Sequence, residues 1–90
     1  EGIAMAYELL CDRMGIECQV VRGQYKNQSH CWNLVTIDDQ SWHLDVTAGE
    51  GKYRFLRSDE ELTEQGYKWS QEDYPVCTVE AAIAARNTVF

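Results

Sequence analysis

The feature that most constrains the fold is a pair of β-forming segments joined by two consecutive aspartates. Residues 30–37 and 41–47 are rich in Val, Ile, Leu, Trp and Thr, which are residue types enriched in strands. The pair Asp38-Asp39 lies between the two segments, and aspartate is a common turn residue. The sequence therefore predicts an antiparallel hairpin. If the two aspartates form a two-residue turn, Ile37 faces Gln40 and the paired residue numbers sum to 77.

This register brings a histidine and an aspartate together. Asp45 falls opposite Trp32, and His30 lies two residues from Trp32 on the same face. His30 and Asp45 are then diagonal neighbours, about 7 to 8 Å apart at Cα, whereas a one-residue slip would place them on opposite faces. A carboxylate that orients a histidine makes the base that a thiol or hydroxyl nucleophile needs. The alternative is a His–Asp pair that only ties two strands together.

The second histidine and the two tryptophans of the hairpin are assigned simpler roles. His43 has no acidic neighbour on its strand face, so a surface or packing role is expected. Trp32 and Trp42 project to opposite faces. Trp42 is expected in the core, and Trp32 is expected to form a wall of the substrate cleft beside the His–Asp pair. A metal site built from both histidines and Asp45 is disfavoured because the histidines are not on neighbouring ladder positions, so no metal and no cofactor are expected.

The cysteines supply no obvious nucleophile or metal site. No C-x-x-C spacing occurs, and two disulfides or buried free thiols are both compatible with the count. Cys31 follows His30 directly, but strand alternation points it to the other face. Cys11 lies well inside the predicted helix, and neither of the other two has a charged partner that the sequence reveals. The four cysteines are Cys11, Cys18, Cys31 and Cys77.

Periodicity predicts the elements around the hairpin. Ile3, Tyr7, Leu10 and Met14 recur at helical spacing, so a helix over residues 2–14 is expected to bury this stripe. The other expected elements are a strand over 16–25, a polar loop over 26–29, a Gly-containing loop over 48–52, a short helix with a capping box from Ser58 to Glu61, an aromatic loop over 67–75 and a final helix capped by Thr78. This order predicts an α+β domain over residues 1–90, with an N-terminal helix packed on a small antiparallel sheet and short C-terminal helices.

Charge and hydropathy exclude two classes of partner. The net charge is −7, and the eight basic residues form no cluster, which argues against nucleic-acid binding. No segment approaches the roughly 20 apolar residues that span a bilayer, so no membrane association is expected.

Several ordered motifs resemble transglutaminase-like domains of the bacterial type, over about residues 1 to 77. These domains read roughly Cys-Glu-Gly-x-Ala, Gly-Ile-x-Cys-x-Val-x-Gly, His-x-Trp-Asn and Asp-Val-Thr. The chain reads Glu1-Gly2-Ile3-Ala4, then Gly15 to Gly23, then His30-Cys31-Trp32-Asn33, then Asp45-Val46-Thr47. The later Tyr53 to Leu56 and Tyr74-Pro75 resemble the region that follows.

The resemblance implies a papain-like fold with a Cys-His-Asp triad, in which His30 and Asp45 are the catalytic histidine and aspartate. The cysteine would immediately precede Glu1, so the chain is expected to be truncated just after it and to be inactive. The parent would act on peptide or glutamine amide bonds of a protein or peptide substrate, with an extracellular or cell-surface location favoured. The alternative is a non-catalytic protein-binding module that retains this fold. Oligomeric state, and protease against cross-linking activity, stay open.

Overall fold

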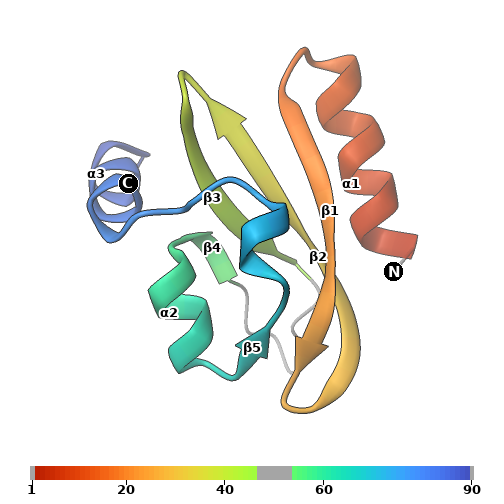
Figure 1. Ribbon diagram of the computed structural model, residues 1–90. Helices are drawn as coiled ribbons and strands as arrows, with labels where there is room; N and C mark the ends of the chain where they lie inside the picture. The colour runs from red at the N-terminus through yellow and green to blue at the C-terminus, as the bar shows by residue number, and fades with distance from the viewer. Residues whose placement is uncertain (1, 47–53, 90) are drawn as a thin grey trace.

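The computed structural model describes residues 2–46 and 54–89 as one antiparallel sheet with helices on both faces (Figure 1). The sheet order is β4-β3-β2-β1-β5, so the N-terminal hairpins form its centre. This is an α+β architecture, as the sequence predicts. The elements are α1 (Gly2–Arg13), β1 (Glu17–Tyr25), β2 (Gln28–Ile37), β3 (Gln40–Asp45), β4 (Arg54–Arg57), α2 (Asp59–Glu64), β5 (Tyr67–Lys68), the 3₁₀ turn η1 (Gln71–Asp73) and α3 (Val79–Val89).

The central hairpin has the predicted register. Ile37 pairs with Gln40, and the ladder continues to Asn33 opposite Leu44. Asp38 and Asp39 have φ angles of 53° and 67°, and positive φ at both positions is the type I′ geometry that matches the twist of the strands. The two-residue turn is therefore confirmed.

The hairpin of β1 and β2 is also tighter than the sequence indicates. The polar loop predicted over 26–29 is wrong, because Lys26 and Asn27 alone make the turn and both have positive φ. The strand resumes at Gln28, which pairs with Tyr25. This longer ladder extends the sheet beyond His30 on both strands.

Helix α1 packs on the face of the sheet that carries Asn33 and Val35. The Asn33 amide donates to the carbonyl oxygen of Ala4 at 2.9 Å, and Cys11 packs against Val35. The predicted buried stripe is wrong except for Tyr7, which is half-buried: Ile3, Leu10 and Met14 are each more than half exposed. Small side chains at Ala4 and Cys11 let the helix backbone approach the strands, which explains the choice of face.

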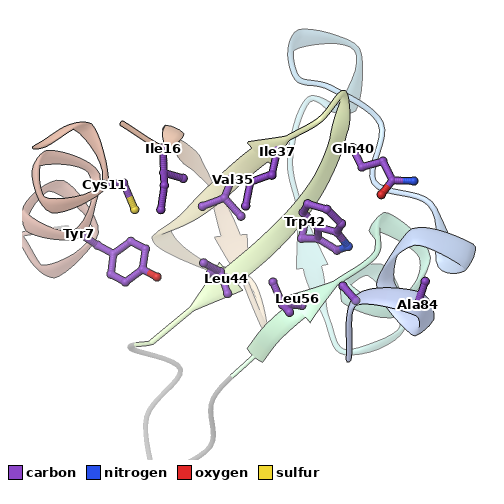
Figure 2. Close-up of a pocket in the computed structure, with 11 residues that line it drawn as sticks. Tyr7, Cys11, Ile16, Val35, Ile37, Gln40, Trp42, Leu44, Leu56 and Ala84 are labelled. Atoms are coloured by element: carbon purple, nitrogen blue, oxygen red, sulfur yellow. The ribbon is translucent and has the colours of Figure 1, made fainter. Parts of the chain in front are cut away.

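Helix α3 covers the same face as α1 but lies over β3 and β4. Trp42 is buried as predicted, and its indole N–H donates to the carbonyl of Ala81 at 2.9 Å. An apolar pocket of about 450 Å³ separates the two helices (Figure 2). The floor of the pocket consists of sheet residues that project toward it, namely Val35, Trp42 and Leu44. Its walls include Tyr7 of α1 and Ala84 of α3.

The opposite face is covered by α2 and the segment that follows it. Ser58 and Glu61 form the predicted capping box, with reciprocal side chain to backbone bonds of 3.1 and 3.0 Å. The predicted loop over 67–75 is only partly correct, because Tyr67 and Lys68 form an edge strand beside β1. The buried cluster on this face comprises Val21, Trp32, Leu34, Leu62, Tyr67 and Cys77.

Two further predictions concern the start of α3 and residues 47–52. Thr78 caps α3 as predicted, since its hydroxyl accepts from the Ala81 N–H at 3.1 Å. The loop predicted over 48–52, and the end of the predicted strand at Thr47, lie outside the described residues. No helix among the described residues has the length and apolar character that crossing a bilayer requires.

Candidate functional site

His30 and Asp45 meet on the face of the sheet opposite α1. The His30 Nε2 lies 2.8 Å from the Asp45 Oδ2, as the register predicts. Asp45 is 1 % exposed, whereas the His30 side chain is 20 % exposed. The carboxylate is therefore enclosed while the imidazole edge reaches the surface.

This bond selects one tautomer of His30. A carboxylate only accepts, so the proton lies on Nε2 and Nδ1 carries the lone pair. None of the described residues forms a hydrogen bond with Nδ1. The pair therefore presents Nδ1 as a base, with Asp45 able to stabilise the imidazolium that forms on proton transfer.

Tyr67 is a third member of this site that the sequence analysis missed. Its hydroxyl donates to Asp45 Oδ2, the same oxygen that accepts from His30. Tyr67 reaches this position because β5 pairs with β1 and brings Tyr67 opposite Tyr25. No local signal in the sequence marks a two-residue edge strand, so the contact could not be anticipated.

Aromatic rings surround His30. Trp32 lies against it in a stacked arrangement, with centroids 6.1 Å apart and an interplanar angle of 25°. The rings of Tyr25 and Tyr67 lie 5.8 and 6.2 Å away. Trp32 is 1 % exposed, so it forms a support for the imidazole; its assignment as a wall of the substrate cleft stays a prediction.

The structure excludes the surface role expected for His43 and fits the packing role, and it adds an acidic partner that the sequence does not reveal. His43 is fully buried, and its Nε2 lies 2.7 Å from Asp59 Oδ1. Asp59 comes from the first turn of α2 and not from a neighbouring strand, so the hairpin register could not reveal the pair. The Nδ1 of His43 accepts the indole N–H of Trp32 at 3.0 Å.

Among residues 2–46 and 54–89, one group of possible metal ligands is found, on this face. The ligand atoms of His43, Asp59 and Cys77 all lie within 4.8 Å of one another. An indole N–H only donates, so Trp32 requires the lone pair of His43 on Nδ1 and the proton on Nε2, where a metal would bind. Burial and the adjacent Asp59 raise the pKa of the Cys77 thiol, which disfavours the thiolate that a metal needs. The contacts therefore favour a hydrogen-bonded network over metal coordination.

All four cysteines are free thiols, and none has a recorded hydrogen bond to His30. Cys31 lies on the other face, where its sulfur accepts from Arg22 at 3.6 Å. Cys11 and Cys77 are buried, and burial together with Cys11 raises the pKa of Cys18 to about 12. The oriented histidine thus has no hydrogen bond to any of these four thiols.

A surface pocket borders the exposed edge of His30. It is lined by Arg22, Gly23, Gln24, Ser29, His30 and Cys31. Arg22 and Cys31 face the side of α1, whereas Gly23 and His30 face the other side, so the pocket extends around the end of the strands.

Searches of protein-family models, of curated proteins and of solved structures each find no match to this chain.

Proposed function

We propose that this chain is part of a transglutaminase-like cysteine enzyme with a papain-like core, in which His30 is the general base and Asp45 its orienting residue. The proposal rests on one hydrogen bond: the buried carboxylate of Asp45 accepts from Nε2 of His30, and the His30 ring is partly exposed. The proton then sits on Nε2 and leaves Nδ1 for a nucleophile.

The direction of α1 supports a nucleophile at the start of that helix. Near its start α1 contacts β2 through Ala4, whose carbonyl accepts from Asn33, and further along it contacts β2 through Cys11, which packs on Val35. Helix α1 therefore runs along β2 in the same direction (Figure 1). A helix rises about 1.5 Å and a strand about 3.3 Å per residue. If α1 continued backward to the position before Glu1, that residue would lie about 6 Å from Ala4 along the axis, level with Cys31 beside the pocket at His30.

A cysteine there would have two sources of activation. The positive end of the helix dipole stabilises a thiolate. His30 faces the other side of β2, so its Nδ1 would take the proton across the pocket that extends around the end of the strands and is lined by both His30 and Cys31. The thiolate would attack a peptide or glutamine amide carbonyl, and the His30 imidazolium would return the proton to the departing amine. Water or a second amine would then release the acyl group, with His30 again as base.

The test compares three chains with an acyl probe that reacts with thiols. We expect the 90-residue chain to show no labelling that depends on His30, whereas the chain with a cysteine added before Glu1 is labelled at that cysteine. His30→Ala in the cysteine-bearing chain should slow labelling by about 10²-fold or more, the scale of general-base catalysis. Equal labelling rates with and without His30 would refute the proposal.

The alternative is a non-catalytic protein-binding module with the same fold. The same experiment separates the two functions. A binding module predicts that an added cysteine reacts at the rate of an ordinary exposed thiol and that His30→Ala changes nothing.

A further inference from the structure

Trp32 joins the two histidines of the site. The Trp32 ring is nearly parallel to that of His30, with centroids 6.1 Å apart, and its indole N–H, at the edge of the ring, donates to His43 Nδ1 at 3.0 Å. Trp69 packs edge-on against both Trp32 and His43, at 5.6 and 4.8 Å between centroids. His43 thus holds the edge of the ring whose face is turned to His30.

The hydrogen bonds hold His43 in one neutral form. Trp32 can only donate, so His43 must keep a lone pair on Nδ1 and a proton on Nε2. That proton goes to Asp59 Oδ1 at 2.7 Å, and Asp59 Oδ2 accepts the backbone N–H of Cys77 at 3.2 Å. Protonation of Nδ1 would set two N–H groups against each other in a site closed to water. His43 is therefore unsuited to exchange protons with a substrate.

We propose that His43 is a positioning residue, which holds the Trp32 ring against His30 by accepting its N–H. Without an acceptor at Nδ1, a buried indole N–H has no partner, and the ring must turn to find one. The surface that supports His30 would turn with it, and the bond from Nε2 to Asp45 would lose its alignment. The role assigned to His30 in catalysis rests on the proposed function, whereas the effect on its tautomer does not.

Two amide substitutions distinguish the two hydrogen bonds of His43, the one from Trp32 and the one to Asp59. In Asn the side-chain oxygen occupies a place close to that of Nδ1, so His43→Asn keeps an acceptor for Trp32 and loses the donor to Asp59. In Gln the side-chain amide extends to the place of Nε2, so His43→Gln keeps the donor to Asp59 and loses the acceptor. His43→Asn is therefore the matched control for His43→Gln.

The measurement is the tautomer of His30 in the ¹⁵N-histidine-labelled 90-residue chain at a pH where the ring is neutral. Two-bond ¹⁵N–¹H spectra show which ring nitrogen carries the proton. We expect a single Nε2–H form in the wild type and in His43→Asn, and a several-fold larger Nδ1–H population in His43→Gln. In the cysteine-bearing chain, labelling should fall about tenfold for His43→Gln and less than twofold for His43→Asn, since displacement of a catalytic group by 1 Å can cost about 10²-fold.

A second variant tests the same bond from its other end, in case His43→Gln does not fold. Trp32→Phe keeps an aromatic ring under His30 and removes the N–H, and we expect the same rise in the Nδ1–H form. Adding His43→Gln to Trp32→Phe should change the His30 spectrum no further.

A folded His43→Gln or Trp32→Phe chain with the wild-type His30 tautomer would overturn the inference and leave the proposed function standing. Conversely, labelling that ignores His30 would overturn the proposed function, while the spectra would still decide the role of His43.

Discussion

Gly23 is the position where a single methyl group should do most damage to this fold. It pairs with His30 across β1 and β2, and its Cα faces the backbone of β5. A Cβ at this position would overlap the carbonyl oxygen of Lys68 and would lie 2.9 Å from Trp32 Cη2 and 3.0 Å from Trp69 Cβ. The first obstacle is backbone, so no side-chain rotation removes it, and β5 must move away from β1.

The expected cost of Gly23→Ala follows from this overlap. Overpacking a well-packed interior costs about 1–3 kcal/mol, and we expect the upper end, about 3 kcal/mol, because the blocking atom is a backbone carbonyl. For a domain of this size, 1 kcal/mol lowers the melting temperature by about 4–8 °C. Gly23→Ala should therefore melt about 12–24 °C below the wild type. Tyr67 shares β5 with Lys68, so the hydrogen bond from Tyr67 to Asp45 should weaken as well.

Thermal unfolding followed by circular dichroism, with urea unfolding as a second measure, checks this prediction. Gly2→Ala is the matched control, since a Cβ on Gly2 meets no atom within 4 Å, and its effect should stay within about 0.5 kcal/mol. If Gly23→Ala unfolds within about 0.5 kcal/mol of the wild type, the close approach of β5 to β1 is not what the structure shows, and the reasoning fails.

Three further perturbations have expected outcomes. Tyr67→Phe removes an O–H that donates to the buried Asp45 carboxylate, so the free energy of unfolding should fall by about 1.5–3 kcal/mol in urea titrations, and an unchanged value would contradict the bond. The ion pair with Arg86 lowers the pKa of Glu61 from 4.5 to about 2, so its contribution is present above pH 4.5 and lost as the pH falls toward 2. Glu61→Gln keeps the capping box but should unfold about 1 kcal/mol more easily at pH 7 and by a smaller difference near pH 2; a difference that does not shrink would exclude the ion pair as its cause. Asp39→Gly should stabilise the chain by about 0.5–1 kcal/mol, because Asp39 has a φ of 67° that glycine adopts without strain, and a destabilised variant would show that its side chain matters more.

The parts of the fold that sequence predicts well are those set by local chemistry. The register of β2 and β3 follows from a two-residue turn at Asp38-Asp39, and it carries His30 to Asp45 without further assumptions. The capping box at Ser58 is a four-residue signal, and it starts α2 where predicted. In both cases every interacting group lies within one hairpin or one helical turn.

The errors have a common cause, which is contact between distant segments. Helix α1 has apolar residues on most sides, so periodicity could not show that Ala4 and Cys11, rather than Leu10, face the sheet. Strands β4 and β5 have four and two residues, too few for a period to appear. Asp59 reaches His43 only because α2 packs on the sheet.

The two His–Asp pairs show why residue types alone do not assign a catalytic role. In the first pair the carboxylate of Asp45 is 1 % exposed and the His30 side chain 20 % exposed; in the second these values are reversed, with His43 at 0 % and Asp59 at 20 %. A general base must bring a lone pair to the substrate. Of the two histidines, His30 is the one at the surface, and its Nδ1 has no hydrogen bond to any described residue. His43 has both nitrogens engaged, by Trp32 and by Asp59, in the interior. The same residue types thus serve one role at the edge of the pocket and another in the interior, and His43 differs from His30 in that its Nδ1 accepts the indole N–H of Trp32.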